Sequence, residues 1–195
     1  MRRRRVGRTL RRRFPAPASQ WNEAYAARHA ELVAFLLEDA DVLALFRHGE
    51  RLPRGYGVAF DERVIEYPWL FAQGLRGRVL DAGSTLNHAH VLDRLPGTVE
   101  ALEIVTLAPE PDSFPGRGIT YRFADLRDLP YEDAAFDTVV SLSTIEHVGM
   151  DTTVYGAREP RSADPRGEVQ RAVRELRRVT APGTYMRCQP AFAAR

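Results

Sequence analysis

The sequence predicts an α/β fold, in which a doubly wound, mostly parallel sheet of about five strands follows an N-terminal helical extension. Short apolar runs recur from residue 78 onward, and amphipathic helical patterns separate some of them. Strands joined through such helices form right-handed crossovers, which give a mostly parallel, helix-covered sheet. The length of 195 residues suits one domain with a small appendage.

Residues 1–18 are expected to form a disordered arm. The first 14 residues, MRRRRVGRTLRRRF, carry eight Arg and no acid, and the Pro-rich FPAPAS acts as a spacer. Subtracting these eight from the 28 basic residues of the chain leaves 20 against 26 acids, so the remaining body is acidic. This balance argues against nucleic acid as a partner of the body. A nucleic-acid-associated protein that uses the arm remains an alternative.

Residues 19–76 are expected to form the helical extension. Apolar residues recur at helical intervals from Trp21 to Phe46, Asp39 marks a break, and Gly49 is a stop. A second helical stretch follows, in which Pro68 is expected in the first turn and Gly74 at the end.

Residues 77–195 are expected to hold the sheet. The predicted strands are RVLDAG, VEALEIVTLA, ITYRFAD, FDTVVSLS and GTYMRCQ. Helical patterns occur in NHAHVLDRL after the first strand and in GEVQRAVRELRRV before the fifth, where apolar residues form one stripe. Ligands of such sheets bind beyond the carboxyl ends of the strands, so the residues there carry the functional prediction.

Those residues are polar. The first strand ends in DAGST, the third in Asp125 and Leu126, and the fourth in SLSTIEH. Gly83 lets the backbone approach a ligand closely, and the hydroxyls and amides of the turn can hold polar groups. His88 and His90 are two residues apart, so on a helix they point to different faces, and no metal site is expected.

Three stretches, VLDAGS, FADLRDLPYEDAAFDTVVSLSTIEHV and AVRELRRVTAPGTYM, resemble class I S-adenosylmethionine-dependent methyltransferases in order and spacing. The resemblance covers roughly residues 78–188 and implies a Rossmann-like fold that uses S-adenosylmethionine. It implies cofactor-binding roles for Asp81, Gly83, Asp125, Leu126 and Ser141. Ser84, Thr85 and Asn87 lie in the same turn as Gly83 and are further candidates for cofactor binding through their polar side chains. His147 would be the base, if the acceptor must lose a proton, and Glu146 would orient it or bind substrate.

The chain departs from the family pattern at three places. Thr85 and Asn87 stand where further glycines are usual, and the usual ribose-binding acid is missing after the second strand, where Glu103 lies too early and Glu110 too late. Only five of the usual seven strands fit, and the resemblance implies the order 3-2-1-4-5 for them. This suggests a shortened C-terminus and an open edge that a homo-oligomer could cover. A degenerate methyltransferase-like protein with little or no activity therefore remains an alternative.

The remaining expectations concern partners and location. The acceptor is expected to be a small or sugar-related molecule, with the polar loop from Val148 to Gly167 helping to bind it. No apolar run approaches the roughly 20 residues that span a bilayer, so no membrane span is expected. Cys188 is the only cysteine, which excludes an intrachain disulfide and favours a cytoplasmic protein.

Overall fold

The structure is a computed structural model that describes residues 1–17, 21–151 and 161–189. The chain forms two compact units. The first comprises Met1–Gly74 with His90–Arg94, and the second comprises Leu75–Ala89 with Leu95–Arg195. Part of the expected acceptor loop, residues 152–160, and the chain end from residue 190 lie outside the described residues.

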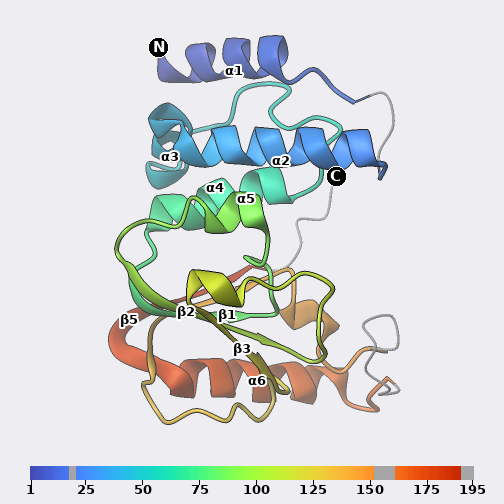
Figure 1. Ribbon diagram of the computed structural model, residues 1–195, viewed down its shortest axis with the longest axis vertical. Helices are drawn as coiled ribbons and strands as arrows, with labels where there is room; N and C mark the ends of the chain where they lie inside the picture. Colours follow the sequence, from blue (N-terminus) through green and yellow to red (C-terminus); the bar gives the residue numbers. More distant parts are fainter. Residues whose placement is uncertain (18–20, 152–160, 190–195) are drawn as a thin grey trace. The chain divides into compact units, whose positions relative to one another are not determined.

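A five-stranded parallel sheet forms the centre of the second unit (Figure 1). Its strands are β1 (Gly77–Ala82), β2 (Val99–Thr106), β3 (Ile119–Phe123), β4 (Phe136–Leu142) and β5 (Thr180–Gln189). They lie in the order β3-β2-β1-β4-β5, as the sequence predicts. The reversal of strand order lies beside β1, where Asp81 pairs in register with Ile104 of β2 and Val140 of β4. The α/β, Rossmann-like fold class is therefore confirmed.

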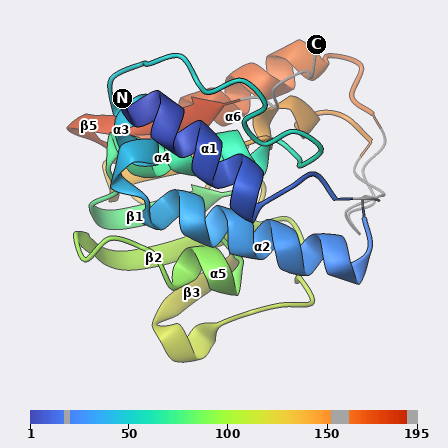
Figure 2. The same cartoon turned by 90° about the horizontal axis from the view of Figure 1, so that it is seen from above.

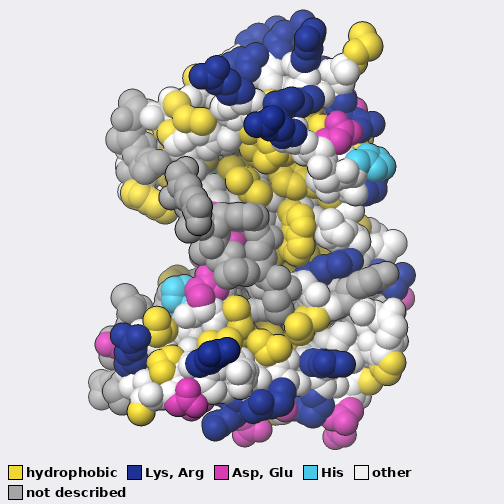
Figure 3. Space-filling view, turned by 180° about the vertical axis from the view of Figure 1, so that it is seen from behind, with side chains coloured by type: hydrophobic (Ala, Val, Ile, Leu, Met, Phe, Trp, Pro, Cys, Tyr) yellow, Lys and Arg dark blue, Asp and Glu magenta, His cyan; other side chains and the backbone are white. Residues whose placement is uncertain are grey.

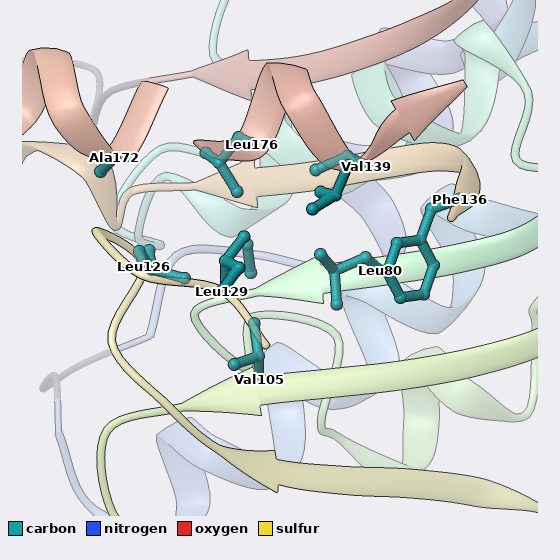
Figure 4. Packing of buried hydrophobic residues seen from close by; sticks show 10 residues of the cluster. Leu80, Val105, Leu126, Leu129, Phe136, Val139, Ala172 and Leu176 are labelled. Carbon is teal, nitrogen blue, oxygen red and sulfur yellow. The ribbon is translucent and has the colours of Figure 1, made fainter. Parts of the chain in front are cut away.

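Helix α6 (Pro165–Val179) covers one face of this sheet. Its apolar stripe, with Ala172 and Leu176 fully buried, packs on Leu80 of β1 and Val139 of β4 (Figure 4). Asp164 begins the helix by accepting a hydrogen bond from the Gly167 N–H at 2.9 Å. Burying a Leu side chain contributes roughly 1.5–3 kcal/mol, so this stripe fixes the helix on the sheet.

The connections carry less helix than the sequence predicts. Between β1 and β2 the helix α5 covers only Ala89–Leu92, whereas the helical pattern extends to residue 95. A 3₁₀ turn, η1 (Pro115–Arg117), lies between β2 and β3. The described residues between β3 and β4 contain no helix. The ends of β2 and β3 are therefore followed by irregular loops, and these loops build the candidate site.

Strand β5 lies at an edge of the sheet and pairs in parallel with β4. Its register shifts between Phe136 and Thr138 of β4, which pair with Thr180 and Tyr185. Gly183 lies inside this irregularity with a φ of +76°, a conformation that favours Gly. The APG segment, expected as a turn before the strand, is thus an irregular first part of β5. No second strand pairs with β5 among the described residues.

The first unit consists of helices: α1 (Arg2–Arg13), α2 (Glu23–Glu38), α3 (Ala40–Arg47) and α4 (Arg63–Gln73). Helix α3 packs against both α2 and α4 (Figure 2). The break expected near Asp39 is confirmed, because this residue ends α2 and caps α3. Its carboxylate accepts hydrogen bonds from the Asp41 and Val42 N–H groups.

The expected disordered arm is wrong for residues 2–13, which form helix α1. Val6 and Leu10 lie on one side of this helix and are 1% and 5% exposed. Arg2 and Arg5 on the same helix contact the acids of the segment from Asp39 to Glu50. The composition alone suggested disorder, but two apolar residues and these long-range ion pairs give the helix a docking surface.

Pro68 lies inside α4, so its expected place in the first turn is also wrong. A proline cannot donate the hydrogen bond that the carbonyl of the residue four positions earlier, Val64, would receive. The Tyr56 hydroxyl donates to that carbonyl instead, at 3.0 Å. Burial raises the pKa of Tyr56 and so keeps the donating proton in place. Gly74 ends the helix at a φ of +82°, as the sequence predicts.

The two units divide between Gly74 and Leu75, whereas the sequence placed the boundary after residue 76. The expected domain boundaries at residues 18 and 76 remain a proposal. None of the helices in the described residues is long and apolar enough to cross a membrane.

Candidate functional site

The turn after β1 is organised by the carboxylate of Asp81. This residue is fully buried, and its two carboxylate oxygens accept hydrogen bonds from the Thr85 N–H at 3.2 Å and the Leu86 N–H at 2.7 Å. Hydrogen bonds to an ionised acceptor are among the stronger ones in proteins. The sequence places Asp81 at the site, and the structure adds that its carboxylate shapes the turn from within.

Gly83 brings this turn against the loop that follows β4. Its φ is +116°, and a side-chain carbon added there would lie 2.7 Å from Cβ of Thr144. Thr85 connects the same two loops by donating a hydrogen bond from its hydroxyl to the Leu142 carbonyl at 3.0 Å. Only Gly fits this position, because both the backbone conformation and the contact with Thr144 exclude a side chain.

Asn87 ties the end of the turn to the loop between β2 and β3. Its amide nitrogen donates to the Glu110 carboxylate and to the Asp112 carbonyl, each at 2.9 Å, and its amide oxygen accepts from the Tyr121 hydroxyl at 2.8 Å. The Tyr121 hydroxyl also accepts from the Phe114 N–H. This network places Glu110 beside the first turn, although its position in the sequence suggested that it lay too far along the chain.

A cavity of about 150 Å³ lies between these loops. Ser84 belongs to its lining, together with Thr106 at the end of β2, Glu110 and Tyr121. The Ser84 hydroxyl oxygen is buried and has no hydrogen-bond partner among the described residues. Because buried polar groups are nearly always satisfied, this hydroxyl is a candidate ligand-binding group.

Ser141 supplies a second buried hydroxyl, near the end of β4. The residue is fully buried, and its hydroxyl oxygen likewise lacks a hydrogen-bond partner within the described part of the chain. Beyond it, η2 (Ile145–His147) carries Glu146, which is half-buried, and His147, which is exposed. Neither of these two residues lines the cavity beside Ser84.

Asp125 lies just after β3 and contacts Arg127 rather than the turn after β1. It accepts from the Arg127 N–H at 2.8 Å and from the guanidinium, which also contacts Glu168 of α6 at 3.2 Å. Burial alone would raise the pKa of the Asp125 carboxyl, but the bonds from Arg127 outweigh it and hold the pKa below its ordinary value of 3.8. Leu126 is buried in the core cluster, so only its backbone is left to face a ligand.

Acid should weaken the fold partly through Asp125. A lowered carboxyl pKa adds stability that is present above the pKa of the unfolded chain and is lost as pH falls through the folded pKa. Urea unfolding between pH 6 and about pH 3 measures the free energy of unfolding. Below pH 4 we expect this free energy to fall less steeply with pH in Asp125→Asn than in the native chain. Asp128→Asn, at an exposed position of the same loop, should keep the native slope. Identical slopes in all three proteins would contradict the pairing.

The sequence predicts no role for Tyr121 or Thr144, and it places Glu110 too late in the chain to bind the ribose. Glu110 and Tyr121 are linked to the site through Asn87. Tyr121 lies in β3, and the loop that carries Glu110 has no periodic pattern that would indicate its path. Thr144 follows β4 in the polar stretch SLSTIEH, and its place beyond the end of a predicted strand could have indicated that it lies at the site. Its contact with Gly83 depends on the packing of two loops and is not visible in the sequence.

Solved structures similar to this chain were found at low identity. The cyclase SpnF is 19% identical with a TM-score of 0.43, covering 88% of this chain and 60% of that one. An S-adenosylmethionine-dependent methyltransferase from Mesorhizobium loti is 18% identical with a TM-score of 0.39, and the match covers 62% of this chain and 51% of that one. One from Aquifex aeolicus is 13% identical with a TM-score of 0.38, and the match covers 65% of this chain and 66% of that one. In three other similar solved structures, the match with this chain covers 46%, 42% and 46% of the length of the solved protein. A comparison with curated proteins gave no match.

The model of one protein family, described as the methyltransferase domain, matches residues 80–188. These residues begin in β1, end in β5 and include every residue of the turn after β1, the Asp125 loop and η2. The match covers more than half of the chain and includes the whole resemblance region apart from its first two residues. The chain therefore belongs to the methyltransferase domain family.

Proposed function

We propose that the chain binds S-adenosylmethionine beyond the carboxyl ends of β1, β2 and β3 and transfers its methyl group to a small-molecule acceptor. The observation that carries this proposal is the buried, unsatisfied hydroxyl of Ser84 in a cavity that Glu110 also lines. A ligand rich in hydroxyl groups would satisfy Ser84 and be held by the carboxylate. Family membership supports the choice of a nucleoside cofactor.

The residues at this edge fit such a cofactor by their donor and acceptor types. Ser84 and Glu110 suit ribose hydroxyls, since a carboxylate accepts from both hydroxyls and Ser can donate or accept. Arg127 already donates to both carboxylate oxygens of Asp125, so a bond from the adenine amino group to Asp125 would replace one of the guanidinium bonds, and the Leu126 N–H would donate to the adenine ring. The unsatisfied Ser141 hydroxyl suits the polar groups of the methionine part.

The chemistry divides between cofactor and protein. The cofactor, when bound, supplies an activated sulfonium methyl group. Asp81 would hold the turn that positions the binding groups, and Asn87 would hold Glu110 beside it. His147 would accept the proton of an acceptor that must lose one, and Glu146 would orient His147 or contact the acceptor. The main contribution of the protein is then alignment of two bound reactants.

Binding of adenosylhomocysteine, measured by calorimetry, tests this proposal. We expect saturable binding to the native chain. Glu110→Gln keeps an acceptor for Asn87 but loses the charge, and should bind about ten to a hundred times more weakly, as expected for a lost charged hydrogen bond of about 1.5–3 kcal/mol. Glu100→Gln, an exposed change in β2, should bind like the native chain. Equal affinity in both variants would remove Glu110 from the site.

A methyltransferase-like protein with little or no activity is the second candidate. The contact between Thr144 and Gly83 favours it, because a threonine side chain takes the space next to the glycine. The cavity of about 150 Å³ is also smaller than the roughly 300 Å³ at which small-molecule pockets begin. A folded native chain that gives no binding heat with adenosylhomocysteine would make this candidate the better one.

Two further sequence predictions stay proposals. A homo-oligomer could cover the edge of β5, since β4 is its only strand partner among the described residues. A cytoplasmic location is supported by the single cysteine of the sequence.

A further inference from the structure

Five of the eight arginines of helix α1 fall into two groups with different surroundings. Arg2 contacts Glu50 at 2.7 Å and Arg5 contacts Asp39 at 2.9 Å, and both also contact Asp41. These ion pairs, with buried Val6 on the same helix, attach α1 to the rest of the helical unit. Two arginines are therefore used within the fold.

The second group faces outward. Arg4, Arg8 and Arg11 are exposed, and none of them pairs with a carboxylate of the described residues. Their spacing of four and three residues places them on one side of the helix, about 6 Å and 4.5 Å apart along its axis. Figure 3 shows Arg side chains, drawn in dark blue, gathered over this part of the helical unit.

These arginines line an open groove of about 960 Å³, which we call the α1 groove. Its lining residues include seven Arg and one acid, which is Asp41: Met1, Arg2, Arg3, Arg4, Arg5, Gly7, Arg8, Arg11, Asp41, Pro53 and Arg54. Asp41 is already paired with Arg2 and Arg5, so it does not neutralise the others. The α1 groove is thus a concave surface with a strong positive charge.

We propose that the α1 groove binds the sugar–phosphate backbone of a nucleic acid. A guanidinium binds phosphate oxygens through two parallel hydrogen bonds, and a row of them along a helix can contact successive phosphates. Among the described residues no aromatic side chain lines the α1 groove, so the contacts expected there are those of Arg with phosphates, which carry no preference for base sequence. The site lies within the helical unit and does not depend on the proposed cofactor site.

The burial of the apolar side of α1 argues against a membrane as the partner. Helices that bind a membrane surface insert an exposed apolar face, whereas Val6 and Leu10 of α1 are buried within the protein. The concave shape of the α1 groove also fits a nucleic-acid strand better than the flat surface of a bilayer. Outside residues 1–13 the acids outnumber the basic residues, whereas seven of the residues that line the α1 groove are Arg and only one is an acid.

Fluorescence anisotropy with a labelled 20-nucleotide DNA, single-stranded or duplex, tests the proposal on the full chain. We expect binding that weakens steeply between 50 and 200 mM salt. The triple variant Arg4→Gln, Arg8→Gln, Arg11→Gln should bind at least about tenfold more weakly at 50 mM salt. Its slope of log affinity against log salt should be smaller by about two to three, since each phosphate contact adds roughly 0.7–0.9.

A matched triple variant controls for the loss of charge. Arg166, Arg174 and Arg177 are exposed on α6, and their replacement by Gln removes the same charge from another place. This control should keep the native affinity within about twofold, and circular dichroism should show that both triple variants remain folded. Equal weakening in both triples would overturn the proposal. So would absence of DNA binding by the native chain, including the case in which it binds phosphatidylserine vesicles instead.

Discussion

Replacing Gly83 with Ala will lower the free energy of unfolding by about 2–6 kcal/mol and abolish binding of adenosylhomocysteine. Two effects add at this position. A non-glycine residue at a φ of +116° costs about 1–3 kcal/mol, and the added methyl group would lie 2.7 Å from Cβ of Thr144, an overlap that costs about 1–3 kcal/mol more. Urea unfolding and calorimetry of the variant measure both consequences.

A second glycine serves as the control. Gly97 has no atom within 4 Å of an added side-chain carbon and no positive φ, so Gly97→Ala should change stability by less than about 0.5 kcal/mol. The double variant Gly83→Ala, Thr144→Gly should recover the stability that Gly83→Ala loses through overlap with Thr144. The loss that comes from the positive φ should remain. If Gly83→Ala is as stable as Gly97→Ala, the close approach of the two loops is wrong.

Replacing Asp81 with Ala will cost about 2–4 kcal/mol of folding stability and weaken binding of adenosylhomocysteine. The variant leaves the N–H groups of Thr85 and Leu86 without their acceptor, and each unsatisfied buried donor costs about 1–3 kcal/mol. The turn after β1 then loses the bonds that fix its shape. Hydrogen exchange at these two amides should become faster than in the native chain, which localises the effect.

The exposed Asp128 provides the matched control for this change. Asp128→Ala also removes one carboxylate but should leave the stability and the two amide exchange rates close to native. A loss below about 0.5 kcal/mol in Asp81→Ala, or unchanged exchange at Thr85 and Leu86, would show that the carboxylate does not organise the turn.

The sheet could be predicted because its signals are local. Each strand is a short apolar run, and the stripe of α6 that packs on Leu80 is visible in one window of sequence. Strand order followed from the family resemblance. The helical conformation of the Arg-rich segment could not be predicted in this way. Helix α1 forms ion pairs with acids between residues 39 and 50, and no local sequence pattern connects these acids to it.

The residues of the turn after β1 could be predicted from the sequence, but the residues that contact this turn from other loops could not. Asp81 and Gly83 follow a recognisable strand and belong to the resemblance, so both could be named in advance. Glu110 was considered for the ribose and set aside, because its loop is placed by hydrogen bonds of Asn87 to Glu110 and to Tyr121, residues 23 and 34 positions away from Asn87. Side-chain bonds of this kind are decided by tertiary packing, which a single sequence does not display.

A crystal structure of the chain with adenosylhomocysteine tests the central claim most directly. The account predicts density for the adenosyl group beyond the ends of β1 and β2, with ribose oxygens within about 3.2 Å of the Ser84 hydroxyl and the Glu110 carboxylate. Density for the ligand at another place on the protein, or crystals of folded protein that stay free of ligand at millimolar concentration, would contradict it.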